Sequence, residues 1–134
     1  MIPTGNDILS ANLEMVTLPS KQHCMILDKN RIIGQCNTLE AIKQTVFKIL
    51  NTERYKYVIY SWNYGVELAE LFGQPVRYVC PEIERRVREA LIQDDRITAV
   101  DSFDFDISKR GVVAVTFTVH TIFGDLEEGM VVNI

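Results

Sequence analysis

The fold of this chain is organised around residues 51–73, which read NTERYKYVIYSWNYGVELAELFG. The stretch is dense in aromatic side chains, which are Tyr55, Tyr57, Tyr60, Trp62, Tyr64 and Phe72. Tyr and Trp occur both in cores and at interface hot spots, so the cluster is either core or an anchor patch for a partner. We expect core for the cluster as a whole, and a short helix over residues 66–72 that Gly73 terminates.

Two amphipathic helices flank this stretch. Asn37 and Thr38 are typical of a helix start, and the residues that follow form one apolar stripe at helical spacing. Together they predict a helix over residues 38–51. Residues 74–95 carry a second stripe, formed by Ile83, Val87, Ala90 and Leu91. Pro81 suits the first turn of this second helix, because its missing N–H would be unpaired there anyway. Residues 75–80 then form either a separate turn or the first part of one kinked helix.

Both ends of the folded part predict strands. Residues 23–34 hold two short apolar runs around Lys29 and Asn30, which is typical of a small hairpin. From residue 96 the apolar period becomes two, which predicts a long hairpin over 96–122 with its turn at 108–111. Asp101 interrupts the alternation and indicates a bulge near residues 100–101. We expect a polar loop over 123–129 and a last strand over 130–134.

These elements predict an α+β fold, with two main helices packed on a small antiparallel sheet that has a long C-terminal hairpin. Residues 1–22 show no clear period and are either an extended N-terminal arm that orders on a neighbouring surface or a frayed terminus. We assign residues 1–22 to the extended arm and residues 23–134 to a single domain.

Composition limits the classes of partner. The 134 residues are 47% hydrophobic and 24% charged, which is typical of one folded domain. The net charge of −4 argues against a nucleic-acid partner, because such binding rests on clustered Lys and Arg. No apolar run reaches about 18 residues and no secretory leader pattern opens the sequence. We therefore expect no membrane partner, and free thiols at Cys24, Cys36 and Cys80 in a reducing cytoplasm.

The search for chemistry finds no catalytic, cofactor-binding or metal-ligating set. Glu53 lies in an aromatic setting that could imitate a glycosidase acid, but the adjacent Arg54 would hold it ionised if the two pair. Asp94 and Asp95 belong to a loop, and Asp104 and Asp106 to the wet face of a strand. His23 and His120 are isolated in the sequence, and His120 is expected on a strand surface. We therefore expect a protein that is not an enzyme.

Several stretches together resemble a known family. They are residues 38–73, the run ERRVREALIQDDRI and the run VTFTVHTIFG. They are similar to the baseplate wedge proteins of contractile tails, which are relatives of the phage T4 gene 25 product. The XkdS-like branch of the PBSX prophage is most similar, and TssE is a distant relation. The most specific motifs are Thr52-Glu53-Arg54, Asn63-Tyr64-Gly65 and Asp94-Asp95-Arg96-Ile97.

This resemblance implies a structural subunit of a virion tail baseplate or tail-like particle, present in six copies. It would link the wedge to the first sheath ring and initiate sheath assembly by strand exchange with the sheath protein. Wedge proteins would join its helical side, and hub or tube-initiator proteins are further partners. The alternative is the older reading of the family as a peptidoglycan-degrading tail lysozyme. The family's charged motif has Pro or Gly beside the acid, whereas Thr52 precedes Glu53 here.

We expect a polar clamp at Glu53 and Arg54, made either within the fold or to a wedge partner. The hairpin edge would extend a sheath sheet. The full set of interaction residues that we expect is Glu53, Arg54, Tyr64, Phe103, Phe105, Val115 and Phe117.

Overall fold

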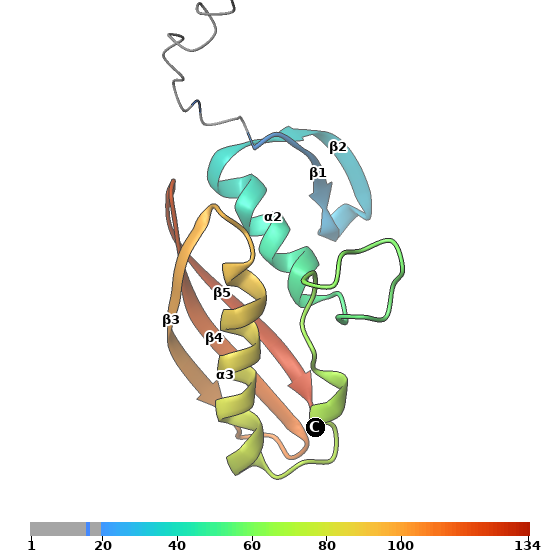
Figure 1. The fold of residues 1–134 in the computed structure, drawn as a ribbon, viewed down its shortest axis with the longest axis vertical. Coiled ribbons are helices and arrows are strands. Elements are labelled where there is room, and N and C mark those ends of the chain that lie inside the picture. Colours follow the sequence, from blue (N-terminus) through green and yellow to red (C-terminus); the bar gives the residue numbers. More distant parts are fainter. Residues whose placement is uncertain (1–15, 17–19) are drawn as a thin grey trace, which may run out of the picture.

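The computed structural model describes residue 16 and residues 20–134. Most of the N-terminal arm expected over 1–22 therefore lies outside the described residues. The described chain is an α+β fold with two long helices, a small two-stranded sheet and a three-stranded antiparallel sheet (Figure 1). This architecture confirms the predicted fold class. None of the helices in the described part of the chain combines the length and the apolarity that crossing a bilayer requires.

The predicted N-terminal hairpin is present. Strands β1 (Gln22–Ile26) and β2 (Arg31–Cys36) pair antiparallel and are joined by a 3-10 turn, η1 (Leu27–Lys29). The hairpin rests on helix α2 (Thr38–Leu50), which begins where the Asn37 side chain accepts a hydrogen bond from the Thr38 N–H at 2.8 Å. The buried face of α2 includes Ile42, Val46 and Ile49, as the apolar stripe predicts.

Helix α3 (Val76–Ile92) begins earlier than expected. The Pro75 carbonyl accepts hydrogen bonds from the N–H groups of Tyr78 and Val79, so the first turn forms before Pro81. Pro81 lies inside the helix, and its predicted first-turn position is wrong. Of the two alternatives for residues 75–80, the separate turn is wrong, because these residues begin the same helix that continues to Ile92. Pro81 lies beyond the first turn, so its missing N–H leaves the Arg77 carbonyl without the usual intrahelical hydrogen bond.

The C-terminal sheet has three long strands in the order β3-β4-β5: β3 (Ile97–Asp106), β4 (Val112–Thr121) and β5 (Gly124–Asn133). The predicted hairpin is confirmed, and its register shifts between Asp101 and Asp104, beside the expected bulge. The polar loop expected over 123–129 is wrong, because β5 begins at Gly124. Glu128 lies on the inner face of β5, opposite buried Phe117. A charged residue at this position interrupts the alternation of apolar and polar residues that identifies a strand in the sequence.

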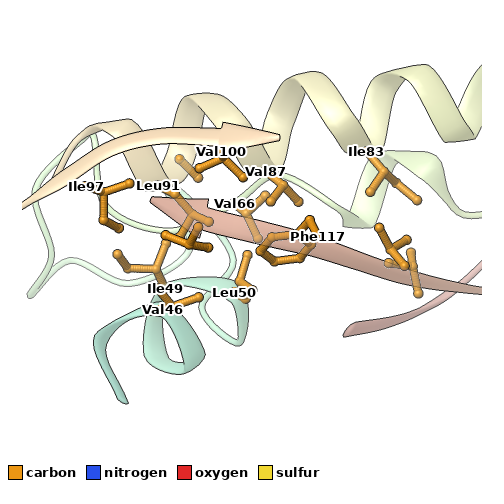
Figure 2. Close-up of a cluster of buried hydrophobic side chains, with 14 of the residues drawn as sticks. Val46, Ile49, Leu50, Val66, Ile83, Val87, Leu91, Ile97, Val100 and Phe117 are labelled. Carbon is orange, nitrogen blue, oxygen red and sulfur yellow. The ribbon is translucent and has the colours of Figure 1, made fainter. Parts of the chain in front are cut away.

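The core lies between the two helices and one face of this sheet (Figure 2). β4 supplies Val113, Val115, Phe117 and Val119, α2 supplies Val46 and Ile49, and α3 supplies Ile83, Val87 and Leu91. Between the helices, in residues 51–73, the fully buried side chains are those of Val66 and Leu71. The helix predicted over 66–72 is wrong, because only the 3-10 turn η2 (Ala69–Leu71) forms there.

Candidate interaction site

The central stretch forms a loop that is closed by main-chain bonds at its base. The Val66 N–H donates to the Thr52 carbonyl at 2.9 Å, and the Arg54 N–H donates to the Val66 carbonyl at 3.2 Å. Glu53 and Val66 thus form an isolated parallel bridge. We call residues 52–54 and 65–66 the loop base, and residues 55–64 the aromatic loop. The backbone of Val66 is committed to this pairing, which explains why a helix does not start there.

Gly65 allows the two sides of the loop base to approach closely. Its φ is +96°, and a Cβ built there would lie 2.5 Å from the Thr52 carbonyl oxygen and 3.1 Å from the Arg54 nitrogen. Only glycine fits both the dihedral angle and the space. The glycine of the predicted turn at residues 63–65 is therefore required for the two sides of the loop base to pair.

Glu53 anchors the segment that follows the loop. Its carboxylate accepts hydrogen bonds from the Leu68 N–H, at 3.1 and 3.2 Å to its two oxygens, and from the Ala69 N–H at 3.2 Å. These N–H groups begin the η2 turn and would otherwise lack partners. Glu53 therefore has a structural use inside the fold.

Arg54 ties the loop base to α3. Its Nε donates to the Gly65 carbonyl at 3.2 Å, and its Nη1 lies 3.1 Å from Glu89 Oε1 and 3.6 Å from Glu67 Oε1. The Arg54 side chain is only 7% exposed, but Glu67 and Glu89 are 32% and 48% exposed, so water still reaches the carboxylates of both pairs. Both charged residues of the predicted clamp thus have partners within the fold. A contact of Glu53 or Arg54 with a wedge protein stays a prediction.

The aromatic loop projects away from the core. Val58 is fully exposed, and Ile59 and Trp62 are 85% and 80% exposed. The expectation that the cluster is core is wrong for most of its members, since Tyr55, Tyr57, Tyr60 and Phe72 are also exposed. Val66 and Leu71 already fill the core beneath the loop base. Tyr64 alone among these aromatic residues packs against the core, and it stacks on Tyr60 with ring centroids 4.5 Å apart.

Two of the sequence motifs line one hollow of about 290 Å³ beside the loop. Its lining includes Asn63, Tyr64 and Gly65 together with Asp94, which lies just after the end of α3. Arg96 holds Asp94 through contacts of 2.9 and 2.6 Å, and these hydrogen bonds lower the pKa of that carboxyl. The second guanidinium nitrogen of Arg96 also donates to the Thr45 hydroxyl at 3.3 Å, which connects this motif to α2.

The four hairpin residues of the predicted interaction set lie on β3 and β4. Phe103 and Phe105 are half-buried, and the Phe103 ring stacks on Phe117 at 5.3 Å. Val115 and Phe117 are buried on β4, the middle strand, whose two edges are already paired. A partner strand can therefore reach this sheet only at β3 or β5. That these seven residues take part in binding stays a prediction. Val115 and Phe117 are buried, so they would support the sheet and would not touch a partner.

The sequence did not reveal an ionic cluster that crosses all three strands. His120 Nε2 lies 2.9 Å from Asp101 on β3, and its Nδ1 lies 2.7 Å from Asp125 on β5. His120 and Asp125 lie opposite each other in the pairing of β4 with β5. The contact could not be predicted from the sequence, because its pattern predicts a loop over residues 123–129. The hydrogen bonds to Asp125 and then Asp101 raise the pKa of His120. Within the described residues, no three His, Cys, Asp or Glu side chains are arranged to hold a metal ion.

The raised pKa of His120 predicts a pH-dependent contribution to stability. Protonated His120 is favoured by folding, so its contribution is fully present below the unfolded pKa of about 6.5 and is lost as pH rises through the folded pKa. We expect wild type to lose stability relative to His120→Gln as pH rises above about 6.5. Urea unfolding across this range measures the difference. In an Asp125→Asn background the difference should shrink, and an unchanged difference would contradict the assignment.

The sequence is also similar to known proteins. A family model described as the contractile injection system sheath initiator matches residues 15–124. The phage-like element PBSX protein XkdS of Bacillus subtilis (strain 168) is 42% identical over 113 residues, which cover 81% of this chain and 79% of that relative. The family match includes the loop base, the aromatic loop, both long helices and strands β1 to β4.

Proposed function

This chain belongs to the contractile injection system sheath initiator family, and from that premise we propose that it is a structural baseplate subunit that starts sheath assembly. In this role it joins the wedge to the first sheath ring of a phage tail or tail-like particle, in six copies around the hub or tube-initiator proteins. The similarity to a phage-like element protein supports the particle type. The two surfaces that the role requires are a sheet edge for the sheath protein and a contact for the wedge.

The β5 edge carries the first part of this proposal. β5 pairs with β4 without a register shift from Gly124 to Asn133, and within the described residues its other edge has no partner strand. β3, the opposite edge strand, has register shifts near Ile97 and after Asp101, which interrupt a regular ladder. A long regular edge is a template for strand addition. We therefore place the strand of the sheath protein beside β5.

The aromatic loop supports the second part. Exposed Trp and Tyr side chains with few charges are typical of interface hot spots, and Val58 and Ile59 extend this apolar surface at its tip. The loop base fixes the position of the loop relative to α3 through Arg54 and Glu89. A preorganised loop binds at a lower entropic cost than a flexible one. We place a wedge protein against the aromatic loop.

Hydrogen exchange measured with and without the purified sheath protein tests the strand addition. We expect deuterium uptake of residues 124–133 to fall on binding, because the outward amides of β5 gain partners. Uptake of residues 97–106 should stay unchanged, which makes β3 the internal control. Protection of β3 instead would move the sheath contact to the other edge. No protection of either strand would contradict a sheath-binding role.

A further inference from the structure

Two of the three cysteines lie together beneath the N-terminal hairpin. Cys24 on β1 and Cys36 on β2 both line a hollow of about 250 Å³ between the hairpin, α2 and β5. Cys36 is 3% exposed, and Cys24 is half-buried at the same hollow. Cys80 belongs to α3 and is not part of this lining. The hollow therefore gives a small reagent one route to both thiols.

Gln44 fixes the positions of both cysteines. Its Oε1 accepts from the Met25 N–H at 2.9 Å, and its Nε2 donates to the His23 carbonyl at 2.8 Å. These two backbone groups flank Cys24, so this buried amide holds β1 at that residue. The Cys36 thiol donates to the same Oε1 at 3.7 Å. One side chain of α2 thus contacts both the Cys36 thiol and the backbone on either side of Cys24.

The two thiols also share neighbours, because both line the hollow and Gln44 lies beside each of them. The nearby Cys36 side chain is the largest cause of the raised pKa of the Cys24 thiol. The register adds local freedom, because Cys24 alone lies opposite Ile33 and Gly34 of β2. Gly34 has a φ of +71°, and a Cβ added there would meet no atom within 4 Å, which leaves room for a small backbone adjustment. Such an adjustment is what a disulfide between neighbouring strands requires.

We propose that Cys24 and Cys36 are the two halves of a reversible disulfide that cross-links β1 to β2. The oxidant is a low-molecular-weight disulfide such as glutathione disulfide. The more accessible Cys24 thiolate attacks one sulfur of the oxidant and releases one glutathione thiolate. The Cys36 thiolate then attacks the Cys24 sulfur and releases the second glutathione. Two protein thiols are oxidised to one disulfide, and the oxidant is reduced to two glutathione molecules that take up the two protons.

The cross-link would act on a weak element of the fold. An isolated two-stranded hairpin is marginally stable, and β1 and β2 are held to the rest of the molecule largely through α2. The bond would close the chain from residue 24 to residue 36 and so restrict opening of the hairpin. If the proposed particle role holds, the hairpin is reduced during synthesis in the cytoplasm and becomes locked when the particle meets an oxidising medium.

The experiment uses the purified full-length protein in glutathione buffers of increasing oxidation. Digestion without reduction, followed by mass spectrometry, identifies each disulfide and each glutathione adduct. We expect an intramolecular bond between Cys24 and Cys36 in wild type and equally in Cys80→Ser, the matched control. In Cys36→Ser, Cys24 should accumulate as its glutathione adduct, because the resolving thiol is absent. Oxidised wild type should also show slower hydrogen exchange over residues 22–36.

Two results would overturn the proposal. The first is wild-type protein in which Cys24 accumulates as a glutathione adduct while Cys36 remains a thiol. The second is a bond from either residue to Cys80 in the folded monomer. Because wild type alone gives both readouts, poor folding of a variant does not affect the decision. The assay contains no sheath or wedge protein, so its failure is separate from failure of the proposed function.

Discussion

We expect Gly65→Ala to lower the free energy of unfolding by about 3 kcal/mol, as the sum of backbone strain and a main-chain clash. The added methyl group would lie 2.5 Å from the Thr52 carbonyl oxygen, and this oxygen cannot move without breaking its bond to the Val66 N–H. The φ of +96° adds strain for any residue with a Cβ. Urea unfolding of the purified variant measures the loss.

Gly73→Ala is the matched control. Gly73 also has a positive φ, at +80°, but a Cβ there meets no atom within 4 Å. The strain remains and the clash is absent, so we expect a loss of only about 1 kcal/mol. If the two variants lose the same free energy of unfolding, the clash with the Thr52 carbonyl oxygen does not contribute to the effect at Gly65.

We expect Ile59→Asp to weaken the proposed binding to the wedge protein by about a hundredfold while leaving the fold intact. Ile59 is 85% exposed at the tip of the aromatic loop, so the folded monomer loses little packing. In the proposed complex the side chain becomes buried, and a carboxylate there would be desolvated without a partner. Titration calorimetry measures the affinity, and the unfolding midpoint checks the fold.

Ile107→Asp serves as the comparison for this change. Ile107 is another exposed isoleucine, 54% exposed, and it follows β3 rather than belonging to the aromatic loop. We expect it to keep wild-type affinity for the wedge protein. An equal loss from both variants would mean that added negative charge, and not the loop, is responsible. Wild-type affinity in Ile59→Asp would place the wedge contact elsewhere.

The elements with a clean apolar period are the ones that the sequence predicts well. The stripe of α2 and the alternation of β4 each place apolar side chains on one face, and both are buried as expected. β5 fails this test because Glu128 takes an inner position, where burial raises the pKa of its carboxyl. Pro81 misleads because the helix has already started at Val76, so this proline lies inside the helix and does not mark its start.

The role of the predicted site residues in binding a partner stays a prediction, but their contacts within the fold are now known. The family resemblance selected Glu53 and Arg54, and the structure gives both of them several partners. Those partners, including Glu67 and Glu89, are distant in sequence from the motif, so no local pattern could identify them. The aromatic loop was misassigned for a related reason. Its aromatic composition is typical of a core. The main-chain hydrogen bonds that join residues 52–54 to Val66 become visible only in the structure, and they leave residues 55–64 outside the core.

The unbroken register between β4 and β5 has a mechanical consequence. All ten residues from Gly124 to Asn133 pair with β4, and the main-chain bonds of an antiparallel ladder run perpendicular to the strands. A pull along a strand added at β5 would therefore load these bonds in shear and together, whereas a sideways pull would open them one after another. The sheet is thus strongest against tension directed along its strands.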